Sequence, residues 1–308
     1  MSQCVSRREM LKLGAGAVVA GGALGVAVAD DAVVPQKRPT MKKAVMWDMI
    51  KGGSTVLDRF RMLKQAGFDG VEMNSPGGPP NHEIKEASAQ TGIVVEGMVD
   101  SVHWLQTLSD PAPSIRAKGL QALQHALRDC KELGGTSVLL VPGICNERAS
   151  YEDCYRRSQE EIRKALPLAR ELDVKIAIEN VWNDFLLSPL EAARYIDEFE
   201  DPAIGWHMDI GNIVAYGYPE QWIRILGKRI LKLHAKDFSR KQSNEQGRWK
   251  GFNVKLGDGD VDWGAVAKSL DDIGYHTWVC AEVTGGGVDE LTDIGRRMDR
   301  ILSLRQSS

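Results

Sequence analysis

The chain has 308 residues, of which 43% are hydrophobic and 26% charged; this composition is typical of a globular protein with a sizeable core and excludes intrinsic disorder. Its 39 basic and 42 acidic side chains leave a net charge of −3 at pH 7. Nucleic acid is therefore disfavoured as the main partner, because phosphate binding needs a basic surface that this composition does not supply.

The first 29 residues have the pattern of an export signal. Arg7 and Arg8 stand in a charged segment, an uncharged stretch rich in Gly, Ala and Val follows from Leu13, and Ala27-Val28-Ala29 forms a small-residue cleavage site. We expect residues 1–29 to be a cleavable twin-arginine signal peptide that directs the protein to the periplasm, and residues 30–40 to be an exposed tether. No other apolar run approaches the ~20 residues of a membrane span, so we expect no stable membrane anchor.

From Met41 onward, short apolar runs alternate with amphipathic stretches. The runs predict strands at Ala44–Trp47, Gly70–Met73, Ile93–Val99, Ser137–Val141, Lys175–Glu179, Ala203–Asp209, Ile230–Ala235 and Thr277–Glu282. The stretches predict helices that include Thr55–Ala66, Ile115–Leu133, Glu152–Leu172, Leu190–Phe199, Trp263–Ile273 and Val288–Leu304. This rhythm over residues 41–308 predicts one α/β domain, a (β/α)₈ TIM barrel. A doubly wound open sheet is the second choice, and it lacks the usual phosphate-binding glycine fingerprint here.

Four consecutive predicted strands end in residues that can ligate a metal: Glu179, Asp209, His234 and Glu282. Closure of a barrel brings the carboxyl ends of its strands around one mouth, where catalytic residues of this fold collect. Three carboxylates and one imidazole form a mixed oxygen and nitrogen set. We therefore expect one divalent metal ion, with Mn²⁺ preferred and Mg²⁺, Co²⁺ or Zn²⁺ as alternatives.

The same positions carry a family resemblance. The segments Glu179–Asn183 (ENVWN), His207–Asn212 (HMDIGN), His234–Asp237 (HAKD) and Gly257–Trp263 (GDGDVDW) resemble the xylose-isomerase-like TIM barrels, among them the D-tagatose 3-epimerase-like and L-ribulose-5-phosphate 3-epimerase-like enzymes. The resemblance implies a sugar or keto-sugar isomerase or epimerase, with the four residues above as metal ligands. It further implies that Glu179 and Glu282 act as the acid/base pair, that the metal stabilises an enediolate, and that the protein forms a homodimer.

Three positions bear on the substrate. The ketose 3-epimerases that this chain resembles have a histidine where Asn212 stands and a second glutamate where Phe185 stands, whereas Arg240 matches their substrate-contacting arginine. These departures leave alternatives open: a 3-keto-glycoside lyase or hydratase using the same metal site, a sugar-binding barrel without catalysis, and an endonuclease-four-like nuclease. The nuclease is disfavoured by the net charge and by the absence of histidine between Phe238 and Gly257.

Further polar and aromatic residues follow the predicted strands. We expect His103, Glu72, Lys236 and Trp182 to contact substrate, although packing explains each of them almost as well. His207 shares a strand face with Asp209 and is expected to support that ligand from behind. The polar stretch Arg240–Lys250 is expected to be a mobile lid.

Overall fold

The computed structural model describes residues 41–304, so the predicted signal peptide and tether lie outside the described residues. None of the helices in the described part of the chain is long and apolar enough to span a membrane.

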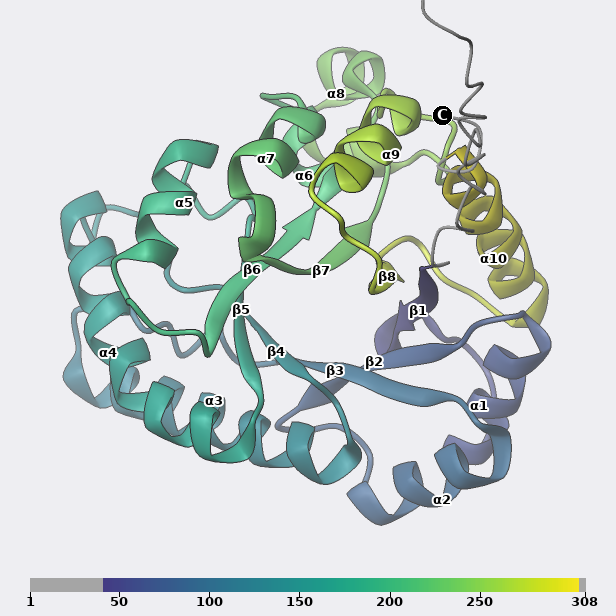
Figure 1. Ribbon diagram of the computed structural model, residues 1–308, viewed down its shortest axis with the longest axis horizontal. Coiled ribbons are helices and arrows are strands. Elements are labelled where there is room, and N and C mark those ends of the chain that lie inside the picture. Colours follow the sequence, from purple (N-terminus) through teal and green to yellow (C-terminus); the bar gives the residue numbers. More distant parts are fainter. Residues whose placement is uncertain (1–40, 305–308) are drawn as a thin grey trace, which may run out of the picture. The chain divides into compact units, whose positions relative to one another are not determined.

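The described residues form a closed barrel of eight parallel strands, each hydrogen-bonded to the next and the last to the first. The strands are β1 (Lys42–Met46), β2 (Gly70–Ser75), β3 (Val94–Asp100), β4 (Ser137–Leu140), β5 (Lys175–Glu179), β6 (Ile204–Asp209), β7 (Ile230–Ala235) and β8 (Trp278–Ala281). The predicted TIM barrel and the order of its eight strands are confirmed, with strand ends that shift by up to two residues. Figure 1 shows the strands around the centre of the barrel and helices on their outer side.

Ten α-helices follow the strands in the described residues. They are α1 (Val56–Gln65), α2 (Asn81–Thr91), α3 (Pro113–Leu133), α4 (Tyr151–Leu172), α5 (Pro189–Asp197), α6 (Ile210–Val214), α7 (Pro219–Leu226), α8 (Arg240–Gln246), α9 (Trp263–Asp272) and α10 (Val288–Ser303). Ser188 and Asp262 cap the starts of α5 and α9 by accepting backbone N–H groups. Helices α2, α6, α7 and α8 were not among the predicted ones. The last three have only 5, 8 and 7 residues, and α2 and α8 bury too few residues to show a clear apolar stripe.

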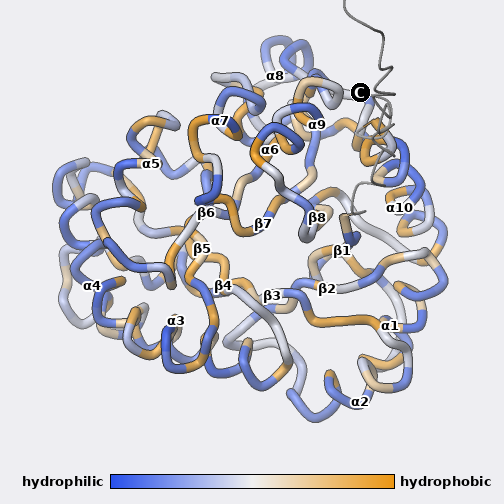
Figure 2. The backbone as a smooth tube through the Cα atoms, viewed as in Figure 1, coloured by the Kyte–Doolittle hydropathy of each residue, from blue (hydrophilic) through white to orange (hydrophobic). Residues whose placement is uncertain are grey.

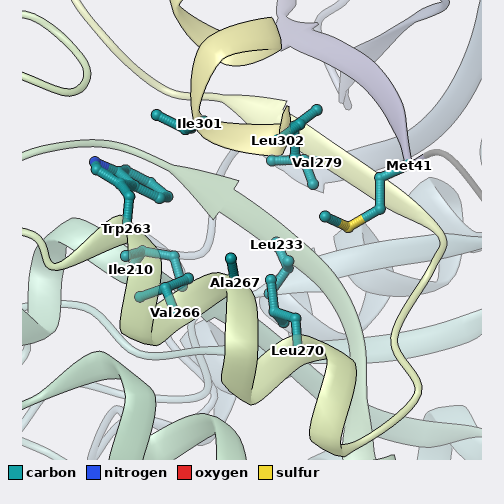
Figure 3. A pocket seen from close by; sticks show the side chains of 10 residues that line it. All are labelled: Met41, Ile210, Leu233, Trp263, Val266, Ala267, Leu270, Val279, Ile301 and Leu302. Carbon is teal, nitrogen blue, oxygen red and sulfur yellow. The ribbon is translucent and has the colours of Figure 1, made fainter. Parts of the chain in front are cut away.

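Packing of helices on strands makes the core. In Figure 2, β4, β5 and β7 are coloured largely as hydrophobic, while the surrounding helices alternate between hydrophilic and hydrophobic residues. Where α9 and α10 pack on the barrel, a cavity of about 20 Å³ remains between Leu233, Val279, Leu270 and Ile301 (Figure 3). Because its walls are apolar, it offers no partner to a water molecule and belongs to the core.

Candidate metal centre

The four predicted ligands meet at the carboxyl ends of strands β5 to β8. Glu179 and Asp209 are the last residues of β5 and β6, His234 lies near the end of β7, and Glu282 follows β8 directly. One ligand atom from each lies within 4.8 Å of the other three. His234 Nδ1 is 3.0 Å from both Glu179 Oε1 and Glu282 Oε2, and 3.9 Å from Asp209 Oδ2. The barrel therefore gathers one imidazole and three carboxylates at one point.

Lys236 brings a positive charge to this group. Its Nζ atom lies 2.8 Å from Glu282 Oε2 and 3.1 Å from Asp209 Oδ2. It follows His234 by two residues and shares its side of the chain. The lysine therefore compensates part of the negative charge that the three carboxylates bring into the barrel mouth.

Burial and close charges shift the pKa of every member of the cluster. Burial raises the pKa of Glu179 and raises that of Asp209 to about 7. Burial would also raise the pKa of Glu282, but Lys236 and His234 outweigh it and hold that pKa well below its usual range. For His234, burial would lower the pKa, whereas the carboxylate of Glu72 and the hydrogen bonds around the ring raise it well above the ordinary value.

The cluster fits a divalent cation. Within residues 41–304, the buried oxygens Asp209 Oδ2 and Glu282 Oε2 accept no well-oriented hydrogen bond, although buried carboxylate oxygens are costly to leave unsatisfied. Three carboxylates face only one lysine and one histidine in the same buried place. Three oxygen ligands and one nitrogen ligand are a set that Mn²⁺ and similar divalent ions accept. These residues thus form a buried candidate metal site.

Asn180, the residue after Glu179, holds Asp209 in position. Its Oδ1 atom accepts hydrogen bonds from the Asp209 backbone N–H (3.1 Å) and from Trp206 Nε1 (3.0 Å), and its Nδ2 atom donates to the Asp209 carbonyl (2.8 Å). Three hydrogen bonds on one buried amide lock the end of β6 to the end of β5. Asn180 lies within the ENVWN motif, but the sequence pattern alone predicted no role for it.

Glu72 orients His234 from the opposite side of the ring. Glu72 Oε2 accepts a hydrogen bond from His234 Nε2 at 2.7 Å, which leaves Nδ1 to face the carboxylates. Such a contact fixes the tautomer of a ligating histidine. Glu72 was expected to contact substrate, but it is 2% exposed and lies below the mouth. The reason is that β2 extends to Ser75, so Glu72 stands inside the barrel and not at the strand end.

The interior of the barrel contains further polar side chains. His207 is fully buried with its ring centroid 4.1 Å from that of His234, and neither of its ring nitrogens has a hydrogen-bond partner among the described residues. It was expected to support Asp209, whereas the structure places it against His234. Deeper in the barrel, Lys232 pairs with the buried carboxylate of Glu96 and donates to the Glu96 carbonyl at 2.7 Å. TIM-barrel interiors are usually filled by branched apolar residues, so this polar layer is a feature of the present chain.

A cavity of about 370 Å³ opens above the cluster. Glu179, His234 and Glu282 reach its wall, while Asp209 stays fully buried beneath. The volume falls in the range of sites for small ligands. Its wall also includes four of the residues expected to contact substrate: His103, Trp182, Asn212 and Lys236.

His103 is a neutral side chain facing this cavity. Burial lowers its pKa to about 3, and its Nδ1 atom accepts a hydrogen bond from the Val141 N–H at 3.2 Å. The proton of the neutral ring is therefore on Nε2, which can donate to a ligand. The ring of Trp104 stands edge-on to it, with centroids 5.8 Å apart.

Arg240 and Phe185 lie outside the cavity wall. Arg240 was expected to contact substrate, but Ser239 caps α8 and Arg240 donates from Nε to the Val214 carbonyl (3.0 Å) and from Nη2 to the Gly217 carbonyl (3.3 Å). Phe185 is buried with its ring 5.3 Å from that of Tyr151. The position where the resembling epimerases have a second glutamate thus faces the protein core.

The stretch predicted as a mobile lid has regular structure. Residues 240–246 form α8, and Arg248–Phe252 form a 3₁₀ helix. Phe252 and Trp249 reach the cavity wall, where their ring centroids lie 4.8 Å from that of Trp182. This aromatic cluster forms one side of the cavity.

Two polar residues on the first strands were missed. Asp48 follows β1 and Asn74 lies near the end of β2; both line the cavity, and Asn74 Nδ2 donates to Asp48 Oδ2 at 2.8 Å. The rule that site residues stand at strand ends would have found them, since the predicted first strand ended at Trp47, directly before Asp48.

The chain is similar in sequence and in fold to known proteins. A family model described as "Xylose isomerase-like TIM barrel" matches residues 60–304. The L-ribulose-5-phosphate 3-epimerase UlaE of Escherichia coli O1:K1 / APEC is 24% identical over 238 residues, which cover 73% of this chain and 81% of the relative. A solved D-tagatose 3-epimerase-like protein is 17% identical with a TM-score of 0.75, over 87% of this chain and 99% of that one. The 3-keto-D-glucoside 4-epimerase YcjR of E. coli is 17% identical with a TM-score of 0.69, over 85% and 99%.

Proposed function

The chain belongs to the xylose isomerase-like TIM-barrel family, and we propose that it is a metal-dependent isomerase or epimerase of a sugar or keto-sugar. The observation that carries the proposal is the cluster of Glu179, Asp209, His234 and Glu282 at the base of a cavity large enough for a small ligand. Its homologues, at low identity, include sugar epimerases.

The metal would be held by Glu179, Asp209, His234 and Glu282. A divalent cation there would act as a Lewis acid and stabilise the negative charge that develops on a substrate oxygen beside the carbonyl. Asp209 lies below the cavity wall and accepts the Asn212 backbone N–H at 2.7 Å, so its role is to hold the ion.

Glu179 and Glu282 move the proton. Both reach the cavity wall, and both lie 3.0 Å from the Nδ1 atom of His234. Because Glu179 ends β5 and Glu282 follows β8, the two carboxylates approach a ligand from two different strands. One carboxylate removes a proton from the carbon beside the carbonyl, and the other returns one from the other side, which inverts the stereocentre. Lys236 and the Nε2–H of His103 donate to substrate oxygens and thereby fix the reacting carbon between the two carboxylates.

A lyase or hydratase acting on a 3-keto-glycoside is a second candidate. It is favoured by Phe185 and Asn212, which replace two substrate-side residues of the resembling ketose epimerases. In that reaction a carboxylate takes the proton from C2, a C1–C2 double bond forms, and the bond from C1 to the aglycone oxygen breaks. The released oxygen takes up a proton.

An NMR assay in D₂O tests both candidates. The Mn²⁺-loaded protein is incubated with free ketoses, ketose phosphates and 3-keto-glycosides. Deuterium beside the carbonyl in an intact skeleton supports isomerase or epimerase chemistry, whereas release of the aglycone supports the lyase. Glu179→Gln and Glu282→Gln should each abolish turnover, while Glu161→Gln, a buried glutamate paired with Arg116 outside the site, should retain it. Full activity of either site variant would refute the acid/base assignment.

We further propose that residues 1–29 export the folded protein to the periplasm by the twin-arginine route. The support is the sequence pattern around Arg7 and Arg8. Replacing both arginines by lysine should retain the protein in the cytoplasm, as measured by cell fractionation; unchanged export would contradict the proposal. The homodimer stays a prediction from the family resemblance, to be measured by sedimentation.

A further inference from the structure

A second hollow adjoins the catalytic cavity. It has a volume of about 580 Å³ and lies between residues 252–256, residues 283–285 and one side of α10. Phe252 lines both spaces. The segment 283–285 also continues directly from Glu282 in the catalytic cluster. The hollow and the cavity are therefore neighbours: Phe252 lines both, and residues 283–285 of the hollow directly follow Glu282 of the cavity.

The lining of the hollow combines an apolar floor with polar rims. Leu256 and Ile294 are buried at its base, and Asn253 and Thr284 stand exposed at its edges. The carboxylates of Asp289 and Glu290 also line it. An apolar surface bordered by hydrogen-bonding groups suits a sugar ring, which presents C–H groups on its faces and hydroxyls at its edge.

The charges around the hollow disfavour an anionic occupant. Both basic residues of the hollow are already paired: Lys255 Nζ lies 3.0 Å from Asp293 Oδ2, and Arg297 lies 3.0 Å from Asp293 and 2.7 Å from Asp258. Asp289 and Glu290 have no ion-pair or hydrogen-bond partner for their carboxylates among the described residues. A phosphate would meet uncompensated negative charge there.

We infer that the substrate is an uncharged two-ring keto-glycoside, with the keto-sugar in the catalytic cavity and the second ring in the adjoining hollow. The inference rests on the proposed function and names its substrate class. Binding energy from the second ring, which takes no part in the chemistry, then raises kcat/KM for the reaction on the first.

The test compares one-ring and two-ring substrates. Deuterium uptake in D₂O is measured for the Mn²⁺-loaded full chain with methyl 3-keto-β-D-glucoside and with 3-keto-cellobiose, in which the same keto-sugar carries a second glucose ring. We expect kcat/KM for the disaccharide to exceed that for the one-ring compound by about tenfold or more, which corresponds to about 1.4 kcal/mol of additional transition-state stabilisation. Thr284→Trp, which fills the hollow, should remove this advantage and leave the one-ring value within about twofold. Asp289→Trp, on α10, should do the same if Thr284→Trp fails to fold.

Thr277→Trp is the matched control, because Thr277 is also an exposed threonine but precedes β8 at the other end of the strand. It should change neither value. Equal kcat/KM for both substrates in the wild-type protein, a preference for phosphorylated sugars, or equal losses on both substrates in Thr284→Trp would overturn the inference.

Binding measurements distinguish a failure of the proposed catalytic function from a failure of the proposed second sugar subsite. Titration calorimetry with 3-keto-cellobiose should show tighter binding to the wild-type protein than to Thr284→Trp, whether or not exchange occurs. Binding that depends on Thr284 without any deuterium exchange would refute the proposed function and support the second subsite. Exchange in a one-ring ketose, with no effect of the hollow on disaccharide binding, would refute the subsite and support the function.

Discussion

The hydrogen bond between Glu72 and His234 offers a sharp test of how the barrel interior orients a residue of the candidate metal site. Glu72 Oε2 is 2.7 Å from His234 Nε2, and the two side chains are 2% and 1% exposed. The bond directs the lone pair of Nδ1 toward the three carboxylates. Glu72→Gln keeps the shape and one acceptor oxygen but removes the negative charge behind the ring.

The size of the effect follows from the type of bond. Hydrogen bonds to charged groups contribute about 1.5–3 kcal/mol, and neutral ones about 0.5–1.5 kcal/mol. Loss of such outer partners weakens metal binding by about 10- to 100-fold. We therefore expect the Kd for Mn²⁺ to rise by at least about tenfold in Glu72→Gln, a loss of about 1.4 kcal/mol or more.

Mn²⁺ binding is measured by titration calorimetry on metal-stripped protein, with circular dichroism to confirm the fold. Glu161→Gln is the control, since Glu161 is also a buried glutamate but pairs with Arg116 on α3, at 3.2 Å. It should leave the Kd within about twofold. A Kd for Glu72→Gln equal to that of the control would show that His234 is oriented without Glu72, and the reasoning would be wrong.

Three further predictions follow from the site. His103→Asn retains an acceptor for the Val141 N–H but removes the ring Nε2–H, and should raise KM by up to about tenfold with little change in melting temperature; an unchanged KM would exclude a substrate contact. Asn180→Leu leaves the buried Trp206 Nε1–H and the backbone N–H and carbonyl of Asp209 without their hydrogen-bond partner. Denaturant titration should therefore show a free energy of unfolding lower by about 3 kcal/mol or more, and Mn²⁺ should bind more weakly. Burial raises the pKa of Asp100 to about 7, above the value of about 4 for an unfolded chain, so its contribution to stability is lost as the pH rises from about 4 to 7. Asp100→Asn should accordingly melt higher than wild type at pH 8 and show no such gain at pH 4; a difference independent of pH would contradict the assignment.

The sequence was sufficient to predict the barrel and the cluster of four candidate metal ligands. Buried parallel strands are short apolar runs, and this pattern is local, so the order of β1 to β8 follows from it. Closure of the barrel then requires the ends of successive strands to meet. Glu179, Asp209, His234 and Glu282 were predicted as one cluster for that reason, and their ligand atoms lie within 4.8 Å.

Tertiary structure alone decided which neighbouring polar residues face the cavity. Glu72 and His207 were expected to contact substrate or support Asp209, yet both lie beside His234 inside the barrel. The depth of a side chain depends on how far its strand continues, and a shift of one or two residues at a strand end moves it from the mouth to the interior. Arg240 is the first residue of α8, and its side chain donates hydrogen bonds to the carbonyls of Val214 and Gly217 instead of reaching the cavity. The direction of the Arg240 side chain results from contacts between segments far apart in the sequence, and so does the hollow beside Phe252. No local sequence pattern predicts such contacts.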